Sequence, residues 1–377
     1  MPTLPRPPNP TAASPRARPL RVVRYHRRAL TGDGGITNSV WSHSAELVGA
    51  GAEVVIAHDG GPPRAETHGI DCANVRHVGG GPWRIPIGLD DVLERADVLV
   101  LHSAWALPNV AAGTVARRLR VPYVLEPRGA YDPRIVGRKR LRKRAWWTLW
   151  ERRLVRGATA IHVFFESERE HLQALGYRGH VIVAPNGVHV PDGVRWDGGS
   201  GGYVLWYGRF DPEHKGVDLL LHAVRRMSPD ERPRLKLHGP DVRGGKDAMR
   251  RLVAELGLRD RVTIGAPVFG AEKYGLLSRA TAFVYPSRWE GFGNAAAEAA
   301  SIGVPTIVTP YPLGCFLAER GGAIRAEATP EALADGLRAA GASGAAEVGR
   351  RAAEIVRDEI TWERVVASWM RQIREIL

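Results

Sequence analysis

Cysteine is scarce in this sequence: only Cys72 and Cys315 occur among 377 residues, and they lie far apart. There is no Cys-x-x-Cys pair and no Cys/His cluster, so a thiolate zinc site is not expected, and isolated thiols fit a reducing compartment. No run of eighteen apolar residues is present, which argues against a transmembrane helix. Residues 1–18 are rich in Pro, Ala and Arg and lack an apolar stretch of signal-peptide length. We interpret them as a disordered tail and expect a cytoplasmic protein.

Acidic residues are also fewer than basic ones, with 40 Asp and Glu against 53 Lys and Arg, for a net charge of +13. This excess predicts attraction to polyanions, namely nucleic acid, an anionic membrane face or phosphorylated substrates, without choosing among them. Two glycine-rich phosphate motifs are missing, G-x-G-x-x-G and G-x-x-x-x-G-K-[ST]. Their absence makes a dinucleotide-binding or P-loop interpretation weak.

What the sequence does contain is a regular alternation of apolar, β-branched runs and amphipathic stretches. This alternation predicts parallel sheets with helices on both faces. The expected strands are 20–26, 52–58, 97–103, 122–127, 160–165 and 181–186, then 203–208, 234–239, 261–266, 281–286 and 305–310. The expected helices are 36–50, 109–120, 138–156, 216–228, 246–257, 271–279, 294–302 and 330–341.

A Gly- and Asp-rich segment separates the two series of strands, and we interpret residues 191–201 as a linker. The sequence therefore predicts an α/β protein of two doubly wound, Rossmann-like domains, 19–190 and 202–355, facing a cleft. An apolar stripe in 356–377 predicts a last helix, which we expect to cross back to the N-terminal domain. Because ligands bind at the carboxyl ends of the strands in such sheets, motifs at these ends are candidate site residues.

The most informative motif is YPSRWEGFGNAAAEAASIGVPTIVT, in which Glu290 lies in a loop and Glu298 lies inside the following helix. The backbone N–H groups of Phe292, Gly293 and Asn294 at the helix start attract anions or hydroxyl oxygens. Carboxylates suit bidentate hydrogen bonds to vicinal sugar hydroxyls. The alternative is that both glutamates are solvated. The alanines around Glu298 favour a closely packed helix, in which this carboxylate needs a partner.

Two strand-to-helix turns are candidate phosphate contacts. In YGRFDPEHKG, Arg209 and Lys215 lie six residues apart, and together they can bind a diphosphate. In the first domain, Gly34 and Gly35 allow a ligand to approach the backbone closely. The alternative interpretation of both segments is an ordinary surface turn.

Three further strand-end residues are weaker candidates. His102 ends an expected strand and can bond a substrate hydroxyl, although a lone His is more often structural. Arg128 lies in EPRG at the end of the next strand, and Asn186 lies in the turn APNGV. The Asn-Gly pair by itself indicates only a turn.

Where they occur together, these motifs resemble those of glycosyltransferase family 4, which has the GT-B fold, and the resemblance covers roughly residues 20–355. The most specific parts are the E-x7-E spacing and the Arg…Lys-Gly turn, and the Asn-Gly turn and glycine loop support them. The stretch from LHSAW to VPYVLEPRGAYDP is similar to members that build cell-surface polysaccharides.

The resemblance implies a role for each matching position. Glu290 and the backbone of 292–294 would bind the donor hexose hydroxyls, Glu298 would bind the ribose, and Arg209 and Lys215 would neutralise the diphosphate. The glycine loop of the first domain would approach the phosphate or the acceptor. Family members retain the anomeric configuration and need no metal, and the lack of any Asp-x-Asp sequence agrees with the second point.

The implied reaction moves a hexosyl unit from a UDP- or GDP-sugar to a hydroxyl of a glycan, lipid-linked or small-molecule acceptor, without another cofactor. Many members have His where this chain has Arg128. This residue would replace the contact to the donor sugar or bind an acidic sugar or acceptor phosphate, and His102 is a second candidate for the contact. The alternatives are a sugar-nucleotide epimerase or hydrolase of the same fold, and a non-catalytic membrane- or nucleic-acid-associated binding protein.

The segment 134–157 carries ten Lys or Arg residues and three tryptophans, Trp146, Trp147 and Trp150. It is either a crossover helix with a solvated cationic face or an interfacial segment that docks on the anionic inner face of a membrane. A lipid-linked acceptor would fit the second interpretation. No nucleic-acid-binding module accompanies the basic run, so no nucleic-acid partner is expected.

Overall fold

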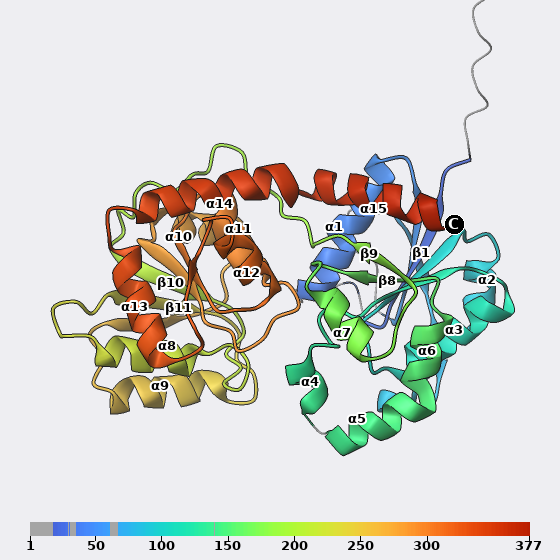
Figure 1. Cartoon of the computed structure of the whole chain (residues 1–377), viewed down its shortest axis with the longest axis horizontal. Helices are drawn as coiled ribbons and strands as arrows, with labels where there is room; N and C mark the ends of the chain where they lie inside the picture. Colours follow the sequence, from blue (N-terminus) through green and yellow to red (C-terminus); the bar gives the residue numbers. More distant parts are fainter. Residues whose placement is uncertain (1–17, 29, 31–34, 61–66, 139) are drawn as a thin grey trace, which may run out of the picture.

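The computed structural model describes residues 18–28, 30, 35–60, 67–138 and 140–377, and within them the chain forms two parallel α/β domains (Figure 1). This arrangement confirms the predicted class of two doubly wound domains. Of the predicted tail, 1–18, only Arg18 belongs to the described part. Among the described helices, none is both long and apolar enough to cross a membrane.

The N-terminal domain is built on a parallel seven-stranded sheet with the order β3-β2-β1-β6-β7-β8-β9. Its strands are β1 (Arg21–His26), β2 (Glu53–His58), β3 (Asp71–Asn74), β6 (Val98–His102), β7 (Tyr123–Glu126), β8 (Ala160–Val163) and β9 (His180–Val183). Its helices are α1 (Gly35–Gly49), α2 (Leu89–Leu93), α3 (Leu107–Arg118), α4 (Pro133–Gly137), α5 (Arg140–Trp146), α6 (Arg152–Gly157) and α7 (Glu168–Ala174). An antiparallel hairpin of β4 (Arg76–Val78) and β5 (Ile85–Ile87) carries a short 3-10 turn, Gly81–Trp83.

The C-terminal domain repeats the design with the order β12-β11-β10-β13-β14-β15. Its strands are β10 (Tyr203–Tyr207), β11 (Arg234–His238), β12 (Val262–Gly265), β13 (Ala282–Tyr285), β14 (Thr306–Val308) and β15 (Ile324–Arg325). Its helices are α8 (Val217–Arg226), α9 (Gly245–Glu255), α10 (Gly270–Arg279), α11 (Asn294–Ser301), α12 (Pro312–Ala318), α13 (Pro330–Ala340) and α14 (Ala345–Glu359).

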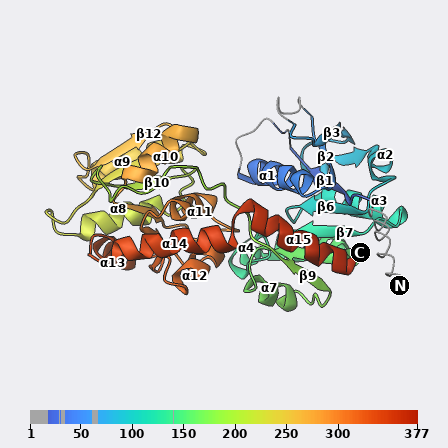
Figure 2. The ribbon, with the colours of Figure 1, turned by 90° about the horizontal axis from the view of Figure 1, so that it is seen from above.

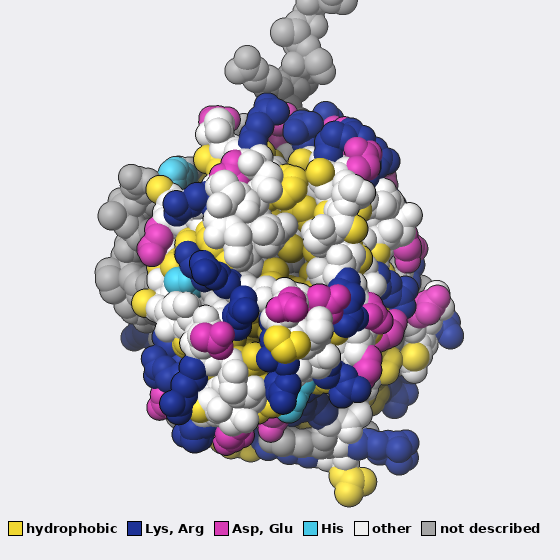
Figure 3. Space-filling model, turned by 90° about the vertical axis from the view of Figure 1, so that its left-hand side faces the viewer, with side chains coloured by type: hydrophobic (Ala, Val, Ile, Leu, Met, Phe, Trp, Pro, Cys, Tyr) yellow, Lys and Arg dark blue, Asp and Glu magenta, His cyan; other side chains and the backbone are white. Residues whose placement is uncertain are grey.

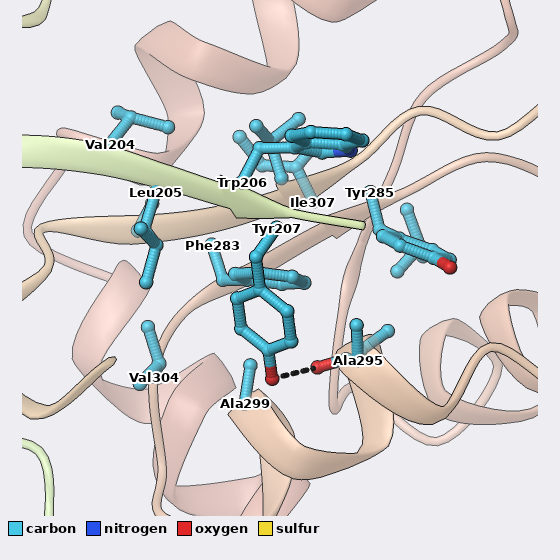
Figure 4. Close-up of a cluster of buried hydrophobic side chains, with 14 of the residues drawn as sticks. Val204, Leu205, Trp206, Tyr207, Phe283, Tyr285, Ala295, Ala299, Val304 and Ile307 are labelled. Atoms are coloured by element: carbon cyan, nitrogen blue, oxygen red, sulfur yellow. Dashed lines mark hydrogen bonds between the residues drawn. The ribbon is translucent and has the colours of Figure 1, made fainter. Parts of the chain in front are cut away.

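The alanine-rich α11 lies directly against the second sheet. Tyr207 of β10 points from the sheet toward this helix, and its hydroxyl lies 3.3 Å from the Ala295 carbonyl oxygen (Figure 4). Four further alanines of α11, at 296, 297, 299 and 300, are fully buried. Their small side chains let the helix backbone approach the strands, which fixes the position of the glutamate-bearing segment.

The last helix, α15 (Trp362–Ile376), continues the line of α14 but packs on the N-terminal domain (Figures 1 and 2). Val365, Trp369 and Ile373 share a buried cluster with residues of β1, β2 and α1. The Gln372 amide accepts from the Val183 N–H at 3.0 Å and donates to the Val183 carbonyl at 2.9 Å. The helix therefore covers the edge strand β9, whose backbone groups would otherwise face solvent.

The main difference from the predicted elements lies in 138–156, which was expected to be one helix. It forms α5, a π-helical turn (Trp147–Glu151) and α6. The π turn adds a residue to the helical repeat and so rotates Glu151 into the interior, where it is fully buried. The short strands β3, β4, β5 and β15 and the helices α2, α4, α7, α12 and α14 were not predicted. The strands have two to four residues, too few for a clear periodic pattern.

Candidate active site at the junction of two domains

Both sheets reverse their strand order at one point, between β1 and β6 in the first domain and between β10 and β13 in the second. Loops that leave such strands diverge, and the space at their carboxyl ends is the usual ligand site of doubly wound sheets. Lys215 follows β10, Glu290 follows β13, and Gly35 follows β1. The predicted motifs therefore lie at these two points.

Lys215 and Glu290 form an ion pair that is almost completely buried. The Lys215 Nζ lies 2.5 Å from Glu290 Oε1 and donates to the Tyr285 hydroxyl at 2.8 Å. Burial alone raises the pKa of Glu290, but the charge of Lys215 and the nearby His214 outweigh it, so this pKa lies below its ordinary value. The carboxylate is thus ionised and held in place by a cation before any ligand binds.

The glycine after Lys215 is required by its surroundings. Gly216 has a φ of 66°, and a Cβ at this position would lie 1.9 Å from the Pro286 carbonyl oxygen. The Lys-Gly turn therefore packs directly against the end of β13, which brings Lys215 to the loop that carries Glu290. Arg209 is exposed at the end of β10, and no described residue accepts a hydrogen bond or ion pair from its guanidinium. It remains available for an anion.

Glu298 has the partners that its place in a packed helix requires. It accepts a hydrogen bond from the Tyr207 hydroxyl at 2.6 Å and pairs with Lys273 of α10 at 2.9 Å. The side chain is only partly exposed, so it is not a freely solvated surface residue. Both oxygens are held by neighbouring elements, which orients the carboxylate.

The first residues of α1 and α11 lie side by side, although they belong to different domains. Asn186 donates both to Asn294 Oδ1 and to Ser39 Oγ, each at 3.2 Å, and so links the two helices. A Cβ on Gly35 would lie 3.3 Å from the Asn294 amide nitrogen. Two positive helix ends therefore meet, an arrangement that favours a bound anion. The predicted Gly34 lies outside the described residues.

Phe292 and Gly293 have structural roles in this loop. The Phe292 ring is buried against Phe164 and Phe165 of the other domain, at 5.8 and 6.0 Å between centroids. Gly293 has a φ of 100°, and a Cβ there would lie 2.8 Å from the Tyr311 ring. Side-chain packing thus fixes the loop, and the contacts that these two residues can offer to a ligand come from the backbone.

The strand ends of the N-terminal domain hold a buried ionic network centred on Glu126. Glu126 lies 2.9 Å from His102, 2.7 Å from Arg128 and 3.6 Å from Arg24. Burial lowers the pKa of His102 to about 3, and the attraction of Glu126 does not overcome this effect. Arg24 donates to the other ring nitrogen at 3.3 Å.

These contacts place His102 differently from the sequence interpretation. Its ring is 2% exposed and both nitrogens have protein partners, so the geometry favours a positioning role over direct contact with a substrate hydroxyl. The reason is that His102 and Glu126 lie opposite each other at the ends of β6 and β7, so the His102 ring packs between Glu126 and Arg24.

Arg128 lies where the two domains touch. Its φ of 55° turns the chain so that Gly129 meets Gly291, and a Cβ on Gly129 would lie only 2.6 Å from the Gly291 Cα. The guanidinium, however, is 8% exposed and pairs with Glu126. Glu126 therefore orients the guanidinium, and this carboxylate is shared with Arg24.

Sequence reasoning missed the residues that surround Lys215 and Glu290. His214 lies 3.5 Å from Glu290, donates from Nε2 to the Trp289 carbonyl at 2.7 Å, and stacks on the Trp289 ring at 4.9 Å. Arg138 lies over the same ring at 4.8 Å. The only sequence signal for His214 and Trp289 was that each precedes a predicted site residue. In the described part of the chain no group of three or more His, Cys, Asp or Glu side chains is arranged to hold a metal ion.

Two doubly wound domains that meet at their switch points form the GT-B architecture. Comparisons with known proteins agree with this class. The family model "Glycosyl transferase 4-like domain" matches residues 34–187, and the model "Glycosyl transferases group 1" matches residues 201–341.

A D-inositol 3-phosphate glycosyltransferase of Frankia alni is 30% identical over 328 residues, 74% of this chain and 78% of that protein. A GDP-mannose:cellobiosyl-diphosphopolyprenol alpha-mannosyltransferase of Xanthomonas oryzae pv. oryzae is 28% identical over 46% of this chain and 47% of its own length. The structure of Anabaena HepE in complex with UDP-glucose has a TM-score of 0.74 and 16% identity over 94% and 100% of the two chains. This chain therefore belongs to the GT4-like glycosyltransferases.

Proposed function

We propose that the protein is a retaining hexosyltransferase that uses a UDP- or GDP-sugar and needs no metal ion. The observation that carries the proposal is the meeting of Arg209, the buried Lys215–Glu290 pair and the starts of α1 and α11. Lys215 uses two of its three N–H groups on Tyr285 and Glu290, which leaves one for a phosphate oxygen. The names of two similar proteins, one with GDP-mannose and one bound to UDP-glucose, support this donor class.

The proposed chemistry relies on stabilising the leaving group. As the bond between the anomeric carbon and the phosphate oxygen breaks, negative charge grows on the nucleoside diphosphate. Arg209, Lys215 and the two helix ends are arranged to stabilise that charge, which removes the need for a divalent ion. The acceptor hydroxyl forms the new glycosidic bond on the same face of the sugar, and its proton passes to the departing phosphate.

Glu290 is proposed to bind hydroxyls of the sugar and not to attack the anomeric carbon. The oxygen Oε1 is engaged by Lys215, and the positive charge at 2.5 Å reduces the nucleophilicity of the carboxylate. The acceptor, a glycan, a lipid-linked glycan or a small molecule, would approach from the N-terminal domain. Because the backbones of Gly129 and Gly291 are in contact, we expect the domains to separate there when the sugar binds.

The test is to incubate the enzyme with UDP- and GDP-hexoses and a panel of acceptors, with and without EDTA, and to follow the anomeric proton by NMR. The expected result is a product with the donor's anomeric configuration, formed equally with EDTA. An inverted product would overturn the retaining assignment, and loss of activity with EDTA would overturn metal independence. Free sugar or an epimerised donor, formed without acceptor, would instead identify a hydrolase or epimerase.

A further inference from the structure

An apolar surface that none of the described helices or strands covers lies on the N-terminal domain. The β4–β5 hairpin pairs Val78 with Ile85 and Arg76 with Ile87, and these four side chains share one face because residues two apart in a strand point the same way. Val78, Ile85 and Ile87 are 60%, 43% and 39% exposed. The opposite face points inward, where Pro86 is buried. The hairpin thus presents its apolar side to solvent.

An aromatic cluster adjoins this hairpin. Trp83, in the turn between the strands, is 57% exposed and lies 6.3 Å from the rings of both Trp146 and Trp150. Trp146 and Trp150 are themselves 4.8 Å apart. The hairpin and the helical segment 140–157 therefore form one surface, which we call the Trp–Arg face.

The helical part of the Trp–Arg face, residues 140–157, carries many cations and a single acid. Its exposed cations include Arg140, Arg142, Arg144, Arg152, Arg153 and Arg156. Glu151 is the only acid within 134–157, and it is fully buried, where it accepts hydrogen bonds from Trp105, Tyr131 and Trp146. Because the π-helical turn buries Glu151, the exposed charged side chains of 140–157 are all cationic.

A shallow groove adds a site for anionic groups. It is open to solvent, has a volume of about 380 Å³, and its lining includes Arg117, Arg152, Arg153 and Arg156. Arg117 donates to the Arg153 carbonyl at 3.4 Å, which holds α3 against α6. Planar guanidinium groups bind phosphate oxygens in pairs, so this groove fits phosphate headgroups.

We propose that the protein docks on an anionic phospholipid bilayer, the cytoplasmic leaflet, through the Trp–Arg face. Tryptophans and aliphatic side chains enter the headgroup region while the arginines contact lipid phosphates, the combination that suits a membrane interface. The aliphatic Val78, Ile85 and Ile87 favour lipid over nucleic acid, because the outer surface of a nucleic acid presents mainly charged phosphates, whereas a bilayer interface takes up apolar side chains. The face does not include the donor-site residues, so this proposal goes beyond the proposed function.

Docking would also orient the junction between the domains. Arg134, in α4 just before this face, donates to the carbonyls of Arg288 and Pro310 at 3.3 and 3.4 Å. Arg138 pairs with Glu213 at 2.5 Å. These contacts tie residues 134–138, which precede the Trp–Arg face in the sequence, to loops of the C-terminal domain that include those before Lys215 and Glu290.

The test is co-sedimentation of the full chain with vesicles of phosphatidylcholine alone or mixed with phosphatidylglycerol, at low salt. We expect binding only to the mixed vesicles. Arg152→Glu/Arg153→Glu should weaken it at least about tenfold, whereas Arg250→Glu/Arg251→Glu on α9, with the same charge change, should bind like the wild type. Trp83→Ala should weaken binding several-fold, and Phe269→Ala, which removes an aromatic ring of similar exposure, should not.

Equal binding by the two double variants, no binding of the wild type to mixed vesicles, or binding to RNA but not to vesicles would each overturn the proposal. Circular dichroism melting of every variant shows whether it is folded, and the exposed positions of all four arginines make misfolding a poor explanation for a difference. Nucleotide binding measured on the same preparations reports on the donor site alone. If the wild type binds no nucleotide, the proposed function is contradicted, whereas the docking result still stands.

Discussion

The two domains share one topology but distribute their charge in opposite ways. In the C-terminal domain, Arg209 and Lys215 retain donors at the site, and basic and acidic side chains are interspersed over the end of the molecule that this domain forms (Figure 3). In the N-terminal domain, the buried guanidinium groups of Arg24 and Arg128 share the single carboxylate of Glu126, and further cations lie exposed on the Trp–Arg face. The strand ends of the same fold therefore carry an exposed cation and a buried ion pair in one domain, and a buried ionic network in the other.

The largest expected effect concerns this buried network. Glu126→Gln leaves Arg24 and Arg128 without their counterion, and removing one partner of a buried ion pair costs about 3–5 kcal/mol of unfolding free energy. Urea denaturation measures this change. Glu331→Gln, which breaks the exposed pair with Arg226, is the control and should cost less than about 1 kcal/mol. Equal losses in the two variants would mean that the network does not stabilise the domain.

The next effect is on turnover. Lys215→Ala removes a cation that faces the departing diphosphate, and we expect kcat to fall by about 10²–10³, as for loss of one transition-state donor. Lys236→Ala is a matched control, because this lysine lies over the Tyr203 ring away from the site. Donor consumption under saturating substrate measures both. A near-wild-type kcat for Lys215→Ala would show that Lys215 does not stabilise the departing diphosphate.

A third effect is on the pH dependence of stability. Burial lowers the pKa of both His102 and His26 to about 3 in the folded protein, while the unfolded chain titrates near 6.5. The unfolded state binds more protons in this window, so stability is full above about pH 6.5 and falls as the pH drops, by up to about 1.4 kcal/mol per pH unit for each group. Urea unfolding between pH 7 and 5 should show a shallower slope for His102→Gln. An unchanged slope would show that His102 is charged in the folded state.

The smallest effect concerns the contact between the domains. Arg138→Ala removes an exposed ion pair with Glu213 and the contact with Trp289, and exposed pairs contribute at most about 1 kcal/mol. We expect a KM for the donor that rises a few-fold with little change in kcat. Arg142→Ala, an exposed arginine of the same segment, serves as the control. A change in kcat larger than that in KM would assign Arg138 a part in the chemical step.

The sequence predicted the part of the site in the C-terminal domain more fully than the part in the N-terminal domain, because the interactions in the two parts differ in range. Lys215 and Glu290 belong to short strand–loop–helix motifs, whose geometry follows from local rules such as the glycine at 216. His102 faces Glu126 only because β6 and β7 pair in one register, which no local pattern fixes. The Asn186–Asn294 contact joins residues 108 positions apart and depends on how the two domains meet.

The segment 138–156 shows the same limit within one domain. Its cations and tryptophans were evident, but a single helix was expected, and the π-helical turn that buries Glu151 was not. The hairpin that completes the Trp–Arg face was also missed, because each of its strands has three residues. Tertiary packing, and not local propensity, determines both features.

The most direct test of the central claim is a thermal-shift screen of UDP, GDP, ADP and TDP on the purified protein and on Lys215→Ala, with and without EDTA. A ligand that binds only the folded state raises the melting temperature by mass action. The account predicts that UDP or GDP selectively stabilises the wild type, equally with EDTA, and stabilises Lys215→Ala far less. If no nucleotide stabilises the folded wild type, or if Lys215→Ala responds equally, the proposed donor site is wrong.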